Sequence, residues 1–379
     1  MGSKLTLGVS GWRLHGQRTG VARYVLSLVE RFTPELILGR FGAINVYVPR
    51  PLEVDGIRLP PSVNEQLLAS RLPMLAWENA RLATAARDDV VFYPSFARPL
   101  VARGATVVTT HEAIMKIAPE MFDKRARFIY GPLYGWSARA ATLVITTSQS
   151  AKRDIVAAWD VDPAKIRVTP LAAAPVFRPL PASVDRAALR ASMFGDDSPY
   201  FLFVGKISGR RNVPDLVRGF LTFKHGTGLP YRLVIAGPDY AIQAARRIAA
   251  ELGAAADVVT RSYVPDDELN AMYNCAEAFV MPSVYENGSL PVMEAQAVGT
   301  PVISVDTEGT RETTGGAALL IPRIDADVLA SAMTRIAGEP ALRSDLSARG
   351  LANSRQYSWA RCADETLAVC EEAARMYRS

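Results

Sequence analysis

Two glutamates, Glu286 and Glu294, lie eight positions apart on either side of an expected strand-to-helix turn. The apolar run 276–282 precedes them and is typical of a strand buried on both faces. A helical pattern follows, and Gly299 and Pro301 close it. The first carboxylate is therefore expected in a loop at the carboxyl end of a strand, where open α/β sheets bind ligands. The second is expected within the following helix.

The turn between these glutamates has the residues that a phosphate site needs. Gly288 allows close approach of the backbone, Ser289 is a candidate helix cap, and Pro291 suits a first helical turn. Free backbone N–H groups at a helix start suit a phosphate, and a carboxylate held nearby suits sugar hydroxyls. We therefore expect a phosphorylated sugar compound as ligand. The alternative interpretation is two exposed acids beside an ordinary turn.

A basic loop follows another expected strand, residues 200–204, and precedes a helix. It carries Lys206, Arg210 and Arg211, and these cations are suited to a diphosphate, lysine as a point charge and arginine as a two-pronged donor. A solvated surface loop would have the same composition, so the spacing alone leaves both interpretations open.

Two further candidates lie in the N-terminal half. His111 directly follows the strand pattern 105–110, so it is expected at the carboxyl end of that strand, where site residues collect. Gly20 lies in a turn before a helical pattern, where backbone N–H groups could face a ligand. The alternatives are a histidine that only hydrogen-bonds its loop and an ordinary turn glycine.

Strand and helix patterns alternate along the whole chain of 379 residues, which is long enough for two domains. This alternation predicts an α/β protein with two doubly wound parallel sheets. The proline-rich segment 170–181 is expected to link them. The expected strands are 4–11, 43–48, 90–94, 105–110, 143–147, 166–171, 200–204, 231–236, 257–264, 276–281, 301–305 and 317–321, and the expected helices include 74–87, 151–159, 213–223, 241–252, 266–273, 290–298, 326–336 and 362–376.

Charge and cysteine content limit the class of protein. Residues 1–180 hold 23 Lys or Arg against 14 Asp or Glu, whereas residues 181–379 hold 20 against 24. The basic half has no nucleic-acid motif, so we expect anionic lipid or a phosphorylated acceptor rather than nucleic acid as its partner. The three cysteines have no zinc or disulfide spacing and are expected to be buried thiols.

Neither a signal peptide nor a membrane-spanning apolar run is apparent, so a cytoplasmic location is expected. Segment 124–139 combines basic and aromatic residues on one expected helix. Such a helix suits peripheral contact with an anionic inner membrane. The alternative is a helix that packs its aromatic residues into the core and leaves its basic ends in water.

The string Glu-Asn-Gly-Ser-Leu-Pro-Val-Met-Glu-Ala-Gln-Ala-Val-Gly-Thr-Pro-Val, residues 286–302, resembles the signature of the family 4 retaining glycosyltransferases, E-G-F-G-L-P-x-x-E-A-x-A-x-G-x-P-V. The segment 111–120 resembles the family's H-D…P-E stretch, and 205–212 resembles its basic loop. The sequence departs from the family at Asn287-Gly288-Ser289, which replaces Gly-Phe-Gly, and at Ala22, which replaces a glycine.

The resemblance implies a GT-B fold, with two Rossmann-like domains facing across a cleft. The implied parts are an acceptor-binding domain, residues 1–172, a nucleotide-sugar-binding domain, residues 182–361, and a C-terminal helix, 362–379, that returns to the first domain. It also implies transfer of a hexose from a nucleotide diphosphate sugar to a glycan acceptor with retention, without a metal ion or another cofactor. GDP-mannose and a UDP-hexose both fit as donor, and a lipid-diphosphate-linked bacterial polysaccharide or O-antigen intermediate fits as acceptor.

The resemblance also implies a role for each candidate residue. His111 would lie beside the donor sugar, Lys206 and Arg211 would bind the diphosphate with Arg210 as a third cation, and Glu294 would bind the ribose. Donor sugar and phosphate would be held by Glu286 and the backbone amides of Asn287, Gly288, Ser289 and Leu290, with Gly20 as a further donor contact. Two other functions remain open, a noncatalytic subunit that binds nucleotide sugar and a sugar-nucleotide epimerase or hydrolase.

Overall fold

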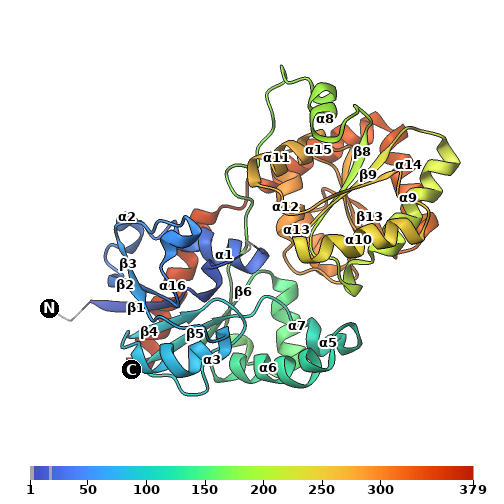
Figure 1. The fold of residues 1–379 in the computed structure, drawn as a ribbon. Coiled ribbons are helices and arrows are strands. Elements are labelled where there is room, and N and C mark those ends of the chain that lie inside the picture. Colours follow the sequence, from blue (N-terminus) through green and yellow to red (C-terminus); the bar gives the residue numbers. More distant parts are fainter. Residues whose placement is uncertain (1–3, 17–18, 379) are drawn as a thin grey trace. The chain divides into compact units, whose positions relative to one another are not determined.

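The computed structural model describes residues 4–16 and 19–378. The chain divides into two compact units: unit 1 comprises Met1–Leu171 and Ser358–Ser379, and unit 2 comprises Ala172–Tyr357. The expected divisions fell after residues 172, 181 and 361, so the observed division assigns the proline-rich link to unit 2. The sheet of each unit is covered by helices (Figure 1).

Unit 1 is built on a parallel sheet, which has seven strands within the described residues, in the order β3-β2-β1-β4-β5-β6-β7. Its central strands are apolar and buried, as in β5, where all five residues are buried. Strands covered on both faces require such continuous apolar runs. The strands are β1 (Leu5–Ser10), β2 (Phe41–Val48), β3 (Val63–Leu67), β4 (Val90–Tyr93), β5 (Ala105–Thr109), β6 (Leu143–Thr146) and β7 (Ile166–Val168).

Unit 2 repeats this plan with a six-stranded parallel sheet in the order β10-β9-β8-β11-β12-β13. In both sheets the strand order reverses beside the first strand, between β1 and β4 in unit 1 and between β8 and β11 in unit 2. Ligands of such sheets bind at the carboxyl ends of the strands at this switch point. The strands are β8 (Tyr200–Val204), β9 (Arg232–Ala236), β10 (Val258–Arg261), β11 (Ala278–Met281), β12 (Val302–Val305) and β13 (Leu319–Ile321).

The helices of unit 1 include two irregular segments. The expected continuous helix 74–87 contains a π-helical turn, Glu78–Leu82, between two short α-helical pieces. The expected helix 124–139 likewise begins with a π-helical turn, Ala126–Tyr130. The α-helices are α1 (Gly20–Val29), α2 (Pro34–Ile37), α3 (Met74–Trp77), α4 (Ala83–Ala85), α5 (Ile114–Ile117), α6 (Gly131–Ala140), α7 (Gln149–Trp159) and α16 (Trp359–Arg378), and short 3-10 turns lie at Trp12–Leu14, Leu52–Asp55, Pro119–Met121 and Pro163–Lys165.

The last helix, α16, belongs to unit 1, where it contacts β4, β5 and β6. Figure 1 shows it, in red, beside the blue strands of that unit. Its buried face includes Cys362 and Cys370, and Trp359 at its start lies 6.2 Å from Tyr24 between ring centroids. Cys275 is also buried and free, so the expectation of three buried thiols is confirmed.

The helices of unit 2 include three that the apolar pattern did not reveal, α8, α13 and α15. The sequence of α13, EGTRETT, has no apolar periodicity and so did not indicate a helix. It forms a helix that Thr307 caps by accepting a hydrogen bond from the Thr310 N–H. The helices are α8 (Arg186–Phe194), α9 (Val213–Thr227), α10 (Asp239–Glu251), α11 (Asp266–Cys275), α12 (Leu290–Ala297), α13 (Glu308–Thr314), α14 (Ala326–Gly338) and α15 (Pro340–Ser354), with a 3-10 turn at Gly209–Arg211.

The segment that follows β7 docks on unit 2. The backbone N–H of Arg178 donates to Asn270 Oδ1 at 3.1 Å, and that of Leu180 donates to Asn274 Oδ1 at 2.9 Å. The Phe177 ring also packs against the core of unit 2. These contacts with α11 explain why the segment clusters with unit 2 instead of forming a separate link.

Candidate functional site

The two loops at the switch point of unit 2 are joined by hydrogen bonds. One loop follows β8 and carries the basic residues, and the other follows β11 and carries Glu286. The Arg210 carbonyl accepts from the Val284 N–H at 3.1 Å and from Ser283 Oγ at 3.3 Å, and Asn212 Nδ2 donates to the Pro282 carbonyl at 3.3 Å. The structure therefore brings together two candidate loops that are about seventy residues apart in the sequence.

A buried ion cluster lies where these loops meet. Glu286 is 6% exposed, and its Oε1 lies 3.0 Å from an Arg211 terminal nitrogen and 3.8 Å from one of Arg210. Arg210 also donates to the Tyr285 carbonyl at 3.2 Å, and Arg211 contacts the Met281 sulfur. Two guanidinium groups around one carboxylate leave a local excess of positive charge, which suits an anionic ligand.

The start of α12 forms the other side of the Glu286 loop. Gly288 has a φ of 109°, a backbone conformation that favours glycine. The close approach to a ligand expected at this glycine remains a prediction. Ser289 is the N-cap residue, but its side chain does not accept the capping hydrogen bond, and its buried Oγ has no partner among the described residues. The expectation of a serine cap is therefore wrong. In the same turn, the Asn287 side-chain amide donates a hydrogen bond to the Tyr285 hydroxyl at 2.6 Å, and Leu290 is buried.

Glu294 lies inside α12 and is 2% exposed. Its Oε2 accepts a hydrogen bond from the Tyr273 hydroxyl at 3.1 Å. The carboxylate thus has a tyrosine hydroxyl of α11 as one partner. Its contact with a ribose remains a prediction.

Lys206 has different contacts from the two arginines of the ion cluster. It is exposed, and its Nζ lies 5.9 Å from the centroid of the Tyr240 ring on α10. A Cβ on Gly237 would collide with the carbonyl oxygen of Gly205, so the loops after β8 and β9 touch there. The structure therefore groups Arg210 and Arg211 around Glu286, whereas Lys206 faces the loop that contains Gly237.

Gly309 is a site residue that sequence reasoning missed. It lies in the first turn of α13, and a Cβ at this position would overlap the carbonyl oxygen of Glu286 and crowd Asn287 Oδ1. Glycine is a poor residue within a helix unless close packing requires it. No pattern in the sequence predicted a helix here, so the glycine between Glu308 and Thr310 gave no signal.

The two candidates in unit 1 occupy different environments. Gly20 is the exposed first residue of α1, so the expected glycine turn is itself the start of the helix. His111 Nε2 lies 3.2 Å from the Pro94 carbonyl oxygen, and its ring contacts those of Tyr24 and Phe96 at centroid distances of 5.0 and 5.1 Å. Burial lowers the pKa of His111 to about 4, so this imidazole is neutral at pH 7.

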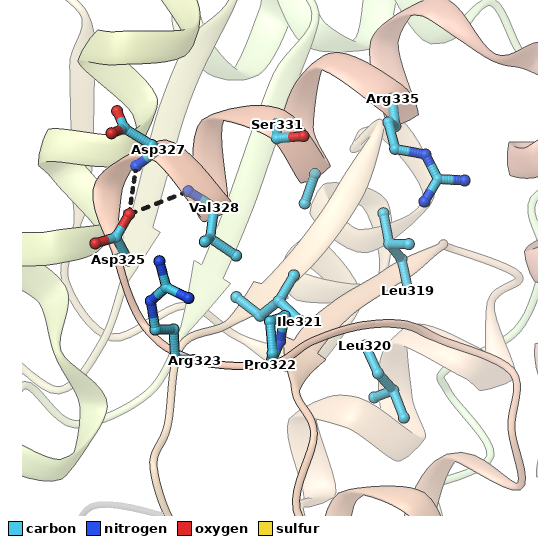
Figure 2. Close-up of a pocket in the computed structure, with 11 residues that line it drawn as sticks. Leu319, Leu320, Ile321, Pro322, Arg323, Asp325, Asp327, Val328, Ser331 and Arg335 are labelled. Carbon is cyan, nitrogen blue, oxygen red and sulfur yellow. Dashed lines mark hydrogen bonds between the residues drawn. The ribbon is translucent and has the colours of Figure 1, made fainter.

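A cavity of about 440 Å³ lies along the edge of the unit 2 sheet, away from the residues of the ion cluster. Figure 2 shows its lining from β13, the following loop and α14, with Asp325 accepting hydrogen bonds from the N–H groups of Asp327 and Val328. Asp325 is thus the cap of α14. Within residues 4–16 and 19–378, no group of three or more His, Cys, Asp or Glu side chains is placed to hold a metal ion.

Family models match both halves of the chain. The model described as glycosyl transferases group 1 matches residues 185–352, which include the ion cluster, α12 and α13. The model described as glycosyltransferase family 4 matches residues 18–173, which include α1 and His111. The two matches fall on separate units and together cover most of the chain.

Curated relatives are glycosyltransferases. The O-antigen chain mannosyltransferase B of Escherichia coli is 27% identical over 370 residues, covering 92% of this chain and 95% of that protein. The D-inositol 3-phosphate glycosyltransferase of Saccharomonospora viridis is 31% identical, but the match covers 64% of this chain and 58% of that protein. The first similarity extends over both units.

Solved structures share the fold along almost the whole chain. Sucrose-phosphate synthase from Thermosynechococcus elongatus has a TM-score of 0.75 at 20% identity, covering 99% of this chain and 98% of that one. WaaG, a glycosyltransferase involved in lipopolysaccharide biosynthesis, has a TM-score of 0.72 at 14% identity, covering 97% and 99%. The two parallel-sheet units are those of the GT-B fold, and with both family models matched the chain belongs to glycosyltransferase family 4.

Proposed function

We propose that the protein is a retaining glycosyltransferase that moves a hexose from a nucleotide diphosphate sugar to a glycan acceptor, with no metal ion and no other cofactor. The favoured donor is GDP-mannose, so the transferred hexose is mannose. The favoured acceptor is a lipid-linked intermediate of a bacterial O-antigen or similar polysaccharide. The observation that carries this proposal is the cluster of Arg210, Arg211 and Glu286 at the switch point of unit 2.

The chemistry assigned to that cluster is stabilisation of the leaving group. In the reaction the bond between the anomeric carbon and the donor phosphate breaks, and the acceptor oxygen forms the new bond on the same face. The acceptor proton passes to an oxygen of the departing diphosphate. Arg211, Arg210 and Lys206 together with the free N–H groups at the start of α12 stabilise the developing negative charge.

Glu286 has a binding role in this scheme. Its Oε1 faces two guanidinium groups and is paired with them, so it is assigned to binding and not to proton donation. It orients the two arginines and, with the backbone at Asn287 to Leu290, holds the donor sugar and phosphate. Glu294 is assigned to the ribose and the neutral imidazole of His111 to a sugar hydroxyl.

The preference for mannose and for a polysaccharide acceptor rests on similarity. The name of the E. coli relative specifies mannosyl transfer to an O-antigen chain, and that similarity covers 92% of this chain. Anabaena HepE, which shares the fold at 14% identity, was crystallised with UDP-glucose, so the fold is also compatible with a UDP-hexose donor. The donor assignment therefore requires a direct comparison.

Transfer assays with GDP-mannose, UDP-glucose and UDP-N-acetylglucosamine and an alkyl α-mannoside acceptor test the proposal. We expect mannosyl transfer from GDP-mannose with retained anomeric configuration, and an unchanged rate in the presence of EDTA. Donor breakdown or epimerisation that does not require acceptor would support the hydrolase or epimerase instead. Selective donor binding without turnover, even with a range of acceptors, would support a noncatalytic subunit.

Contact with the cytoplasmic face of a membrane is the second part of the proposal, and an exposed apolar surface on unit 1 supports it. Phe128 is 66% exposed, and Tyr134 stacks on Phe96 instead of facing water, so the aromatic residues of segment 124–139 divide between surface and core. Ile117, Met121 and Ile129 are also exposed on neighbouring short helices. Among the described residues, no helix has both the length and the apolar character needed to cross a bilayer.

Vesicle binding tests this contact. Replacing the exposed residues Lys124, Arg125 and Arg127 with Gln should weaken sedimentation with phosphatidylglycerol vesicles, because each basic residue near an anionic surface contributes about 1 kcal/mol. Replacing three exposed arginines of unit 2, Arg218, Arg247 and Arg335, is the matched control. Equal vesicle binding by both triple variants would contradict the proposed membrane contact.

A further inference from the structure

A second polar cluster lies at the switch point of unit 1, between β1 and β4. Ser10, the last residue of β1, donates from its Oγ to Glu78 Oε1 at 2.7 Å. Arg13, just beyond β1, donates from its Nε to Ser95 Oγ at 3.0 Å, and Ser95 follows β4. These side chains thus lie at the position in this sheet that corresponds to the ion cluster of unit 2.

Glu78 is a buried acid with an unused oxygen. It is 2% exposed, and its Oε2 has no hydrogen-bond partner among the described residues. Burial raises its pKa to about 8, although the Ser10 hydrogen bond and the Arg13 charge oppose this shift. The side chain is therefore a neutral carboxylic acid at pH 7, able to donate one hydrogen bond and to accept others. A buried polar atom without a partner is costly unless a ligand satisfies it.

Two backbone irregularities coincide at this cluster. Glu78 begins the π-helical turn Glu78–Leu82, and Phe96, next to Ser95, has a φ of 64°. π-Helical turns occur often at functional sites, and a large aromatic residue with positive φ is strained. Their coincidence with the polar cluster marks this region as a candidate functional site.

Aromatic rings line the same region. Phe96 stacks on Tyr134 with centroids 4.9 Å apart and contacts His111 at 5.1 Å. Arg13 reaches the same segment, because its Nε donates to Ser95, the residue that precedes Phe96. Rings that accept the apolar C–H face of a sugar, together with a few polar groups that bind hydroxyls, make a carbohydrate site.

We propose that Arg13 and Glu78 bind hydroxyls of the acceptor sugar, with Phe96 and Tyr134 as the apolar wall of the same subsite. This inference rests on the proposed transferase activity and assigns the acceptor to residues that neither the family resemblance nor the comparisons single out. Glu78 Oε2 has no hydrogen-bond partner among the described residues of the free protein. An acceptor hydroxyl that reaches this oxygen, by displacing the side chains packed against it, would supply that partner. The nucleotide sugar is not involved in this contact.

Steady-state kinetics with GDP-mannose and an alkyl α-mannoside separate the two substrates. Glu78→Ala and Arg13→Ala should each raise the acceptor KM about tenfold, the effect of one or two lost hydrogen bonds, with the donor KM unchanged. Glu78→Gln should stay close to wild type because it replaces a neutral acid with a neutral amide of similar shape. Glu53→Gln, at an exposed acid of the same unit, is the matched control.

A pH profile provides a readout that a merely structural role would not affect. The wild-type acceptor KM should change as pH rises through about 8, where Glu78 ionises, and the Glu78→Gln profile should be flat there. Other groups near Glu78 have pKa values shifted away from this range: His111 has a lowered pKa, and Tyr93 and Tyr134 have raised ones.

Three outcomes distinguish the hypotheses. A folded Glu78→Ala variant with an unchanged acceptor KM, or with only the donor KM raised, would overturn the acceptor subsite while leaving the transferase activity in place. No transfer by the wild-type protein from any nucleotide sugar would overturn the proposed function itself. If Glu78→Ala does not fold, Arg13→Ala and the Glu78→Gln pH profile decide the question.

Discussion

The switch points of the two sheets have the same strand topology but opposite chemistry. In unit 2 the loops after β8 and β11 enclose two guanidinium groups paired with one carboxylate. In unit 1 the region after β1 and β4 holds a protonated Glu78, a neutral His111 and stacked aromatic rings, with Arg13 as its cation. The strand order therefore gives each sheet a switch point of the kind that binds ligands. The side chains at that edge determine which class of ligand it suits.

This difference follows from burial and charge pairing. Glu286 is nearly as buried as Glu78, but it is paired with two arginines. Glu78 has one serine hydrogen bond and a more distant cation, so desolvation dominates and its pKa rises. A charged edge suits a diphosphate, and a largely neutral aromatic edge suits a sugar. The following four predictions test this contrast, from the largest expected effect to the smallest.

Arg211→Ala should cause the largest loss. Removing the cation nearest Glu286 deprives the leaving diphosphate of charge stabilisation, so kcat/KM for transfer should fall about 10²- to 10³-fold. Arg218→Ala, at an exposed position of α9, is the control and should leave transfer unchanged. A folded Arg211→Ala variant with wild-type turnover would show that the charged edge of unit 2 does not serve the reaction.

Glu286→Gln should separate sugar positioning from phosphate binding. Without the carboxylate the two arginines retain their full positive charge, so the affinity for GDP, measured by calorimetry, should not fall. The kcat should fall about 10²-fold, because the arginines and the donor sugar lose their orienting partner. Glu251→Gln on the exposed end of α10 is the control. Weaker GDP binding together with an unchanged kcat would contradict the assignment.

Gly309→Ala should disturb the same loop through packing. The added Cβ would overlap the Glu286 carbonyl, so we expect a loss of about 1–3 kcal/mol in the free energy of unfolding and about a tenfold loss of transfer. Gly226→Ala is a matched change within α9, where the added Cβ meets open space, and it should stabilise slightly. Equal urea denaturation midpoints for both variants would contradict the close approach.

Glu78→Gln should change how stability depends on pH. The folded protein holds the Glu78 proton up to about pH 8, whereas the unfolded chain releases it near the ordinary value of 4.5. The contribution of this residue to the free energy of unfolding therefore falls as pH rises between those values. The Tm of Glu78→Gln relative to wild type should rise across this window. A constant Tm difference would mean that Glu78 is ionised in the folded state.

The sequence predicted most strands of both sheets because buried parallel strands are continuous apolar runs. It missed β3, whose residues Val-Asn-Glu-Gln-Leu are mostly exposed at a sheet edge, and α13, which lacks an apolar face. In such segments tertiary contacts or a cap decide the structure, and no periodic pattern reports them.

The candidate residues of unit 2 were identifiable because each follows a predicted strand, so Arg211 and Glu286 were expected at one edge of one sheet. Glu78 was not identifiable as a site residue, because it lies within a pattern that indicated a regular helix. Its burial depends on packing against β1, which the sequence does not show. The failed cap at Ser289 and the close packing of Gly309 also depend on contacts that only the folded chain reveals.

The assignment of α16 to unit 1 has a consequence for biosynthesis. Unit 2 is one continuous segment, so its sheet and helices can assemble as soon as residue 357 has left the ribosome. The sheet of unit 1 must wait with the apolar surface of β4, β5 and β6 uncovered until Trp359–Arg378 has been made. Of these two units, unit 1 is therefore begun first and completed second.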